Sequence, residues 1–186
     1  GGVLNREIID RLVQGLEQHP HVAVLSDEIY DHILYENQEH VSLLDYPEIR
    51  NRLILLNGWS KTYAMTGWRL GYSIWPRTIL PFAERLAINS YSCPNAATQH
   101  AGIAALDGPQ EAVQKMVAAF DARRSILVEL LNKLPGVSCI KPMGAFYAFP
   151  NIEGTGYSAN ALQNKLLEEV GVAVIAGTSF GALGEN

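Results

Sequence analysis

The chain has 186 residues, of which 48% are hydrophobic and 18% are charged, with 16 glycines and nine prolines. This balance is typical of a globular protein and excludes a disordered, collagen-like or coiled-coil chain. The formal net charge of −5 argues against a nucleic-acid partner, whose phosphates require a basic surface.

The first half of the chain predicts one helix followed by buried strands. Apolar residues at helical spacing predict a helix over 5–18, with Asn5 as its cap. Short continuous apolar runs, typical of strands that are covered on both faces, predict strands at 22–25, 53–56 and 70–75. A helix and three buried strands with long connections indicate part of an α/β sheet.

The second half is predicted to begin with helices at 77–89, 96–106 and 110–134. The last of these would be about 37 Å long, enough to run from one domain into another. Beyond it, the pattern predicts a smaller α/β unit with strands at 137–140, 145–149 and 172–175 and a helix at 158–170.

We therefore predict three parts: part of a large domain at 1–108, a connecting helix at 109–134, and part of a smaller C-terminal domain at 135–186. The chain begins on two glycines directly before a helix and stops just after a predicted strand. Because domains normally end by packing an element into their core, we expect a fragment of a longer protein.

Cellular location is predicted from cysteine use and from the lack of targeting segments. Two cysteines, Cys93 and Cys139, make a disulfide framework implausible and favour a reducing compartment. No apolar run approaches the roughly 20 residues of a membrane span, and the first residues do not resemble a signal peptide. We expect a cytoplasmic protein with no membrane partner.

Chemically capable side chains lie at the ends of the predicted strands. Asp27 and Tyr30 follow the first strand, Ser60 and Lys61 follow the second, and Arg69 precedes the third. Taken singly, an Asp after a strand is usually a turn or helix cap, and a Lys is usually solvated. Together they match pyridoxal phosphate, whose aldehyde needs an amine, whose ring nitrogen needs an acid, and whose phosphate needs Arg and hydroxyl donors.

The distribution of charge is consistent with a bound anion. Residues 58–90 carry a net charge of +3, whereas 1–57 carry −6 and 91–186 carry −2. A basic segment inside an acidic chain favours an anionic ligand held locally, although a difference of a few charges also arises by chance.

Two motifs resemble the cofactor-binding core of class I/II aminotransferases, the aspartate aminotransferase superfamily of fold type I. They are Ser26-Asp27-Glu28-Ile29-Tyr30 and the segment Ser60-Lys61-Thr62-Tyr63-Ala64-Met65-Thr66-Gly67-Trp68-Arg69-Leu70-Gly71-Tyr72. Weaker similarity extends to 1–4, 141–147 and 177–181. The resemblance implies an α/β fold: the C-terminal half of the large, cofactor-binding domain plus a smaller α/β C-terminal domain.

The resemblance also implies a role for each matched residue. Lys61 would form the Schiff base with pyridoxal 5'-phosphate and then act as the base that moves the proton. Asp27 would hold the proton of the pyridine nitrogen, and Tyr30 would contact the ring oxygen. Ser60 and Arg69 would bind the phosphate. The parent enzyme would transfer an amino group between an amino acid and a 2-oxo acid, as a homodimer.

Some parts of the family's site are not found in the chain. The phosphate loop and the ring-stacking aromatic would precede Gly1, and the arginine that binds the substrate carboxylate would follow Gly184-Glu185. Ala176 also stands where a proline is common in the family. We therefore expect the fragment itself to be inactive.

Other functions stay open or are disfavoured. A fold-type-I C–S lyase or synthase would share the same lysine chemistry, and the piece could also be a non-catalytic module. Absorbance after addition of pyridoxal phosphate would separate the module from the enzyme. The five histidines show no metal-site spacing, and dinucleotide and phosphate-loop motifs are absent from the sequence.

Overall fold

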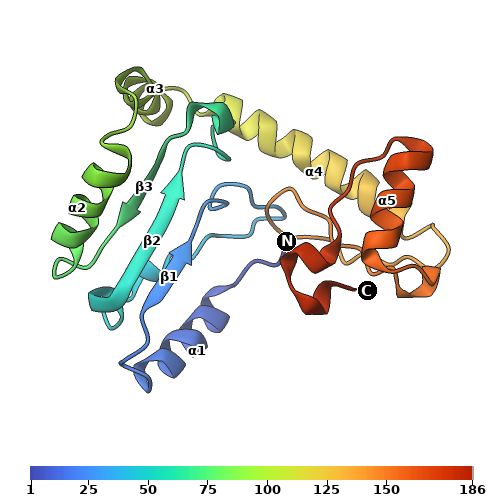
Figure 1. Cartoon of the computed structure of the whole chain (residues 1–186), viewed down its shortest axis with the longest axis horizontal. Coiled ribbons are helices and arrows are strands. Elements are labelled where there is room, and N and C mark those ends of the chain that lie inside the picture. Colours follow the sequence, from blue (N-terminus) through green and yellow to red (C-terminus); the bar gives the residue numbers. More distant parts are fainter. Residues whose placement is uncertain (186) are drawn as a thin grey trace. The chain divides into compact units, whose positions relative to one another are not determined.

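The computed structural model of the protein describes residues 1–185 and divides into two compact units. The sheet unit consists of Gly2–Ala118 and Met143–Ala145 (Figure 1). The C-terminal unit consists of Gly1, Ala119–Pro142 and the chain from Phe146 onward. Each unit is described by itself below.

Helix α1, Arg6–Glu17, opens the sheet unit and confirms the first predicted helix. Asn5 caps it as predicted, because its Oδ1 accepts a hydrogen bond of 3.0 Å from the amide of Ile8. Ile9 and Val13 lie one helical turn apart on its buried side. These side chains attach the helix to the core of the unit.

The sheet has three strands in the order β1-β2-β3, with bounds Val24–Asp27, Leu53–Gly58 and Gly71–Ile74. β1 and β2 are parallel, whereas β3 is antiparallel to β2. All three predicted strands are confirmed, but β1 begins two residues later than predicted and ends on Asp27 itself. The backbone of Asp27 is therefore held by strand pairing.

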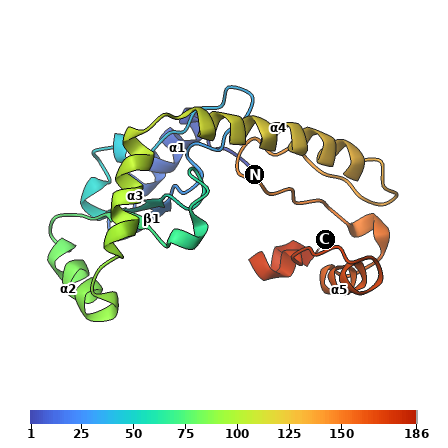
Figure 2. The same cartoon turned by 90° about the horizontal axis from the view of Figure 1, so that it is seen from above.

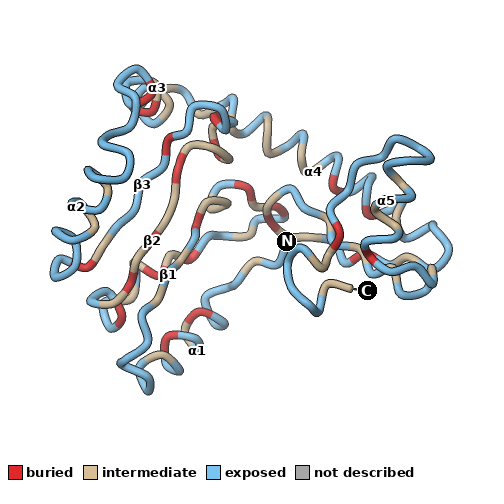
Figure 3. The backbone as a smooth tube through the Cα atoms, viewed as in Figure 1, coloured by how far each residue is buried: buried red, intermediate tan, exposed pale blue. Residues whose placement is uncertain are grey.

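A hydrophobic cluster packs against the first residues of β1 and β2. It joins α1 to β2 and to the loop between β1 and β2, and its buried members are Ile9, Val13, Val41, Leu43, Ile49 and Leu53 (Figure 3). Leu25, which points to the opposite face, is 62% exposed, and every residue of β3 is exposed. The prediction that these strands are covered on both faces is therefore wrong for β1 and β3.

Helices α2, Leu80–Tyr91, and α3, Ala96–Asp107, confirm the next two predicted helices. The side chain of Asn95 caps α3 by accepting from the amide of Thr98 at 3.2 Å. Trp59 donates its indole N–H to the carbonyl of Gly102 at 3.0 Å, which attaches α3 to the loop after β2.

Helix α4, Glu111–Leu131, confirms the long predicted helix, although it is shorter at its C-terminal end (Figure 2). The division between the two units falls within it, after Ala118. No helix of the described chain is both long enough and apolar enough to cross a membrane.

The C-terminal unit holds helix α5, Ala159–Val170, which confirms the helix predicted at 158–170 and is capped by Ser158. The predicted strands at 137–140, 145–149 and 172–175 are wrong. An isolated bridge pairs Ser138 with Asn151 in this unit, and another pairs Leu34 with Gly144 within the sheet unit. A strand needs an extended neighbour over several residues, and these apolar segments have none in the described chain. One of their side chains, Ile140, is 92% exposed.

Short 3-10 helices complete the described structure. Their bounds are Leu43–Asp45, Arg50–Arg52, Thr66–Trp68, Glu153–Thr155, Gly177–Phe180 and Ala182–Glu185. The third of them immediately precedes Arg69 and shapes the entry to β3.

Gly58, the last residue of β2, leads to a testable prediction about packing. A Cβ atom there would lie 2.8 Å from the carbonyl oxygen of Leu70 and 2.9 Å from the Cα of Gly71. Because both are backbone atoms, Gly58→Ala should lower the free energy of unfolding by about 1–3 kcal/mol. Gly15→Ala is the control, since it meets nothing within 4 Å inside α1 and should be neutral or stabilising. Urea unfolding of both variants checks this, and equal stabilities would contradict it.

Candidate active site

The parallel pairing of β1 and β2 brings two chemically capable segments to one edge of the sheet. Asp27 lies opposite Leu56, and the amide of Glu28 donates to the carbonyl of Leu56 at 2.9 Å. Lys61 follows the end of β2 by three residues. Ligands of open α/β sheets bind at the carboxyl ends of the strands, so this edge is the candidate site.

The structure brings Lys61 and Tyr30 together. The Nζ atom of Lys61 lies 5.8 Å from the centre of the Tyr30 ring, within the range of a cation–π contact. Lys61 sits in a tight turn in which the amides of Tyr63 and Met65 both donate to the carbonyl of Trp59. The amine and the phenol therefore come from two different loops that meet at the sheet edge.

The carboxylate of Asp27 is exposed and held by the backbone that follows it. Its Oδ1 accepts a hydrogen bond of 3.2 Å from the amide of Ile29, which makes a local turn of the kind favoured by Asp. One oxygen is thus oriented by the chain. The carboxylate lies on the same open face of the sheet as Leu25.

Arg69 lines a cavity of the sheet unit that neither Lys61 nor Tyr30 lines. It lines an open cavity of about 900 Å³, together with Ala64, Gly67, Trp68, Gly71, Tyr91, Cys93, Pro94, Asn95 and Thr98. Its backbone is left-handed, with φ +55°, and a guanidinium nitrogen donates to the carbonyl of Thr66 at 3.0 Å. A non-glycine residue in this conformation costs about 1 kcal/mol or more, and such strain clusters at functional sites.

Four of the five predicted site residues do not line that cavity: Asp27, Tyr30, Ser60 and Lys61. Ser60 is half-buried in the turn directly before Lys61. The structure thus groups Asp27, Tyr30 and Lys61 at the sheet edge and places Arg69 in the neighbouring cavity of the same unit.

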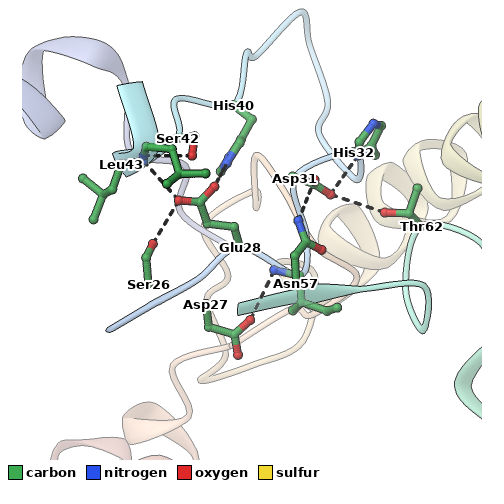
Figure 4. Close-up of polar contacts among 12 residues, drawn as sticks. Ser26, Asp27, Glu28, Asp31, His32, His40, Ser42, Leu43, Asn57 and Thr62 are labelled. Atoms are coloured by element: carbon green, nitrogen blue, oxygen red, sulfur yellow. Dashed lines mark hydrogen bonds and ion pairs between the residues drawn. The ribbon is translucent and has the colours of Figure 1, made fainter. Parts of the chain in front are cut away.

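Glu28 is a buried residue of this region that the sequence reasoning missed. Its side chain is 7% exposed and accepts hydrogen bonds from Ser26 Oγ at 3.1 Å and from the amide of Leu43 at 3.1 Å (Figure 4). His40 Nε2 pairs with its other oxygen at 2.7 Å. Glu28 thereby fastens the long loop between β1 and β2 to the end of β1, immediately beside Asp27.

The Glu28–His40 pair shifts the pKa values of both groups. Burial raises the pKa of Glu28, but hydrogen bonds from His40, Ser42 and the Leu43 amide together outweigh it, so the pKa lies below its ordinary value of 4.5. The hydrogen bond to Glu28 raises the pKa of His40 above its ordinary value of 6.5, against the opposing effect of burial.

These directions predict how stability depends on pH. The contribution of Glu28 is present above pH 4.5 and is lost as pH falls through its lowered pKa. The contribution of His40 is present below pH 6.5 and is lost as pH rises through its raised pKa. The pair therefore stabilises the fold most between these two values. As pH rises through the raised pKa of His40, the free energy of unfolding should fall by at most about 1 kcal/mol, because the pair is partly exposed.

His40→Ala tests this prediction by urea unfolding at about pH 6 and about pH 8. The variant should lose less unfolding free energy than the wild type as pH rises. His100→Ala, at an exposed position of α3, should follow the wild type. Parallel pH profiles for wild type and His40→Ala would rule out the pair as a source of the dependence.

Asp31 is a second residue that the sequence reasoning missed. Its carboxylate accepts from Asn57 Nδ2 at 2.8 Å and from Thr62 Oγ1 at 3.4 Å, and it pairs with His32 Nδ1 at 2.8 Å (Figure 4). Burial raises the pKa of Asp31, but hydrogen bonds from His32 and Asn57 outweigh it and lower the pKa. No local motif marks this residue, because two of its partners lie about thirty positions away.

Metal-ligating side chains do not gather in the part of the chain that the structure describes. Within residues 1–185, no group of three or more His, Cys, Asp or Glu side chains is placed to hold a metal ion. Both cysteines are free thiols, with Cys93 exposed and Cys139 buried.

The similarity of this chain to known proteins covers its full length. The sequence model of the family described as "Aminotransferase class I and II" matches residues 1–186. The aspartate aminotransferase of Geobacillus stearothermophilus is 41% identical over 167 residues, which are 87% of this chain and 42% of that protein. The aspartate aminotransferase of Pyrococcus horikoshii is 40% identical over 191 residues, covering 100% of this chain and 47% of that protein.

A solved structure supports the same relationship. The aromatic aminotransferase from Pyrococcus horikoshii matches with a TM-score of 0.94 and 35% identity, over 99% of this chain and 49% of that one. The chain thus spans about half the length of the curated relatives that it matches. Its fold is that of fold-type-I aminotransferases, which confirms the predicted α/β class. This chain belongs to the class I and II aminotransferase family.

Proposed function

We propose that this chain is part of a pyridoxal-phosphate-dependent aminotransferase that moves an amino group between an amino acid and a 2-oxo acid. The observation that carries the proposal is the Lys61–Tyr30 contact, with Nζ 5.8 Å from the ring centre, at the sheet edge where Asp27 ends β1. Membership of the family supports it independently.

The side chains of the site fit this cofactor in their chemistry. When bound, pyridoxal phosphate supplies an electron sink for bonds at the amino acid's α-carbon. The amine of Lys61 would bond its aldehyde carbon, and the carboxylate of Asp27 would face its ring nitrogen. The Tyr30 hydroxyl would donate to the ring oxygen. Arg69 and Ser60 would hold the phosphate, for which a guanidinium and a hydroxyl are suitable donors.

Lys61 also supplies the proton transfer in this proposal. With the cofactor and substrate bound, the free amine of Lys61 would take the proton from the substrate's α-carbon and would later give it back on the cofactor side of the imine nitrogen. Its short turn after β2 keeps the amine at the sheet edge during both steps. Tyr30 lies beside it and limits the directions that the lysine chain can take.

Asp27 acts through its charge in this proposal. An ionised carboxylate favours a protonated ring nitrogen, and that positive charge in turn favours the ionised form of the acid. The hydrogen bond from the Ile29 amide orients one carboxylate oxygen, and the exposed position on the open sheet face leaves room for a ligand.

We further propose a homodimer in the cytoplasm. Free Cys93 and Cys139 are consistent with a reducing compartment. Exposed apolar side chains on α2, among them Phe82, Leu86 and Ile88, offer a surface for burial in an assembly. Light scattering of the full-length protein measures its mass directly.

The experiment for the activity is an amino-acid balance with the full-length protein and pyridoxal phosphate. Aspartate is the first donor to test, since the matched relatives of Geobacillus and Pyrococcus are named for it, with a panel of 2-oxo acids as acceptors. Aminotransfer yields one new amino acid for each donor consumed. Release of ammonia without a new amino acid would indicate a lyase, and no turnover with any pair would indicate a non-catalytic module.

A further inference from the structure

We propose that Asp31 is a positioning residue that holds Tyr30 and Lys61 at their working separation. The catalytic importance of the Tyr30–Lys61 separation rests on the proposed function. The contacts by which Asp31 connects the two loops do not depend on that function. Asp31 directly follows Tyr30, and Thr62, one of its partners, directly follows Lys61. The same carboxylate therefore touches both loops that carry the site.

The stronger of the two links runs through Asn57. Its Nδ2 donates to Asp31 Oδ2 at 2.8 Å, while its Oδ1 accepts from the amide of Gly58 at 2.7 Å. The bond from Gly58 fixes the orientation of the Asn57 side-chain amide. The Nδ2 group is therefore already directed toward Asp31. The end of β2 is thus attached to the turn that carries Tyr30.

The link through Thr62 is longer but buried. Its Oγ1 lies 3.4 Å from Asp31 Oδ1, and the residue is 3% exposed. At that distance the hydrogen bond is weak, so the larger share of the coupling should pass through Asn57. Two separate attachments to one carboxylate nevertheless restrict rotation of the Lys61 turn about the strand end.

His32 provides a matched control within the same cluster. It pairs with Asp31 at 2.8 Å, yet its side chain is 60% exposed and it comes from the same loop as Tyr30. Removing His32 takes away a partner of Asp31 without cutting either attachment to the β2 side. A positioning role for Asp31 and a general loss of charge pairing therefore predict different results for this variant.

The test measures Lys61 in the full-length protein without added cofactor, so it does not depend on turnover. Trace labelling with acetic anhydride, read by peptide mass spectrometry, compares Lys61 with exposed Lys115 as an internal reference. Asp31→Ala should raise the relative labelling of Lys61 about threefold or more, because the turn is released. Asn57→Ala should raise it similarly, the double variant no further, and His32→Ala should leave it unchanged.

Kinetics supply a second readout. With cofactor present, Asp31→Ala should lower kcat more than it changes KM for the amino acid, and Asp31→Asn should restore part of the rate, since its Oδ1 can still accept from Asn57. If Asp31→Ala does not fold by circular dichroism, Asn57→Ala carries the labelling test, because it cuts the stronger attachment and leaves Asp31 in place. Unchanged labelling of Lys61 in the folded Asp31→Ala or Asn57→Ala variant would overturn the proposal. A labelling response in a protein whose Lys61→Ala variant keeps full activity would support the coupling while refuting the proposed function.

Discussion

Replacement of Lys61 by alanine in the full-length protein is expected to lower the rate of amino-group transfer by about 10³–10⁶-fold. The alanine removes both the amine that would hold the cofactor and the base that would move the proton, and the structure offers no second amine in the described turn between Trp59 and Met65. The measurement is kcat with aspartate and a 2-oxo acid, together with the visible absorbance of the cofactor-loaded protein, which should be lost.

Lys115→Ala is the matched control, since Lys115 is exposed on α4 and lies in the same structural unit. It should keep wild-type turnover and absorbance. A Lys61→Ala variant that folds, as judged by circular dichroism, and still turns over within tenfold of wild type (about 1.4 kcal/mol) would be incompatible with the proposed role.

Asp27→Asn is expected to lower turnover by about 100-fold or more while the cofactor stays bound. The structure makes this substitution a test of charge rather than shape. An asparagine keeps the Oδ1 atom that accepts from the Ile29 amide, so the turn after β1 should be retained. What is lost is the ionised carboxylate that favours a protonated ring nitrogen.

Two measurements separate those effects. Titration of the variant with pyridoxal phosphate should show binding within a few-fold of the wild type, whereas kcat should fall. Asp45→Asn, an exposed carboxylate in the 3-10 helix Leu43–Asp45, is the control and should leave both unchanged. Activity of Asp27→Asn within a few-fold of wild type would show that its charge is not used.

Much of the sheet unit could be predicted from sequence, because its signals are local. The cap at Asn5 and the apolar period of the following residues specify α1, and the runs at 53–56 and 70–75 specify β2 and β3. The strands predicted at 137–140 and 172–175 failed for a physical reason. An apolar run shows that a segment can be extended, but only a neighbouring strand makes it part of a sheet.

Some residues of the candidate site could likewise be predicted from the sequence, and others could not. Asp27 and Lys61 could be selected because they follow apolar runs whose carboxyl ends share an edge. Glu28 and Asp31 could not, because their partners His40, Asn57 and Thr62 come together only when the loop after β1 folds back. Nothing in the immediate sequence distinguishes a carboxylate with three such partners from one in water. Their burial is a consequence of tertiary structure.

The most direct test of the central claim is the position of the cofactor on the chain. Borohydride reduction of the full-length protein loaded with pyridoxal phosphate makes the lysine bond permanent, and peptide mapping then identifies the modified residue. The proposed function predicts a single label on Lys61. A stoichiometric label on Lys115, Lys133, Lys141 or Lys165, or on a lysine outside this chain, would contradict it.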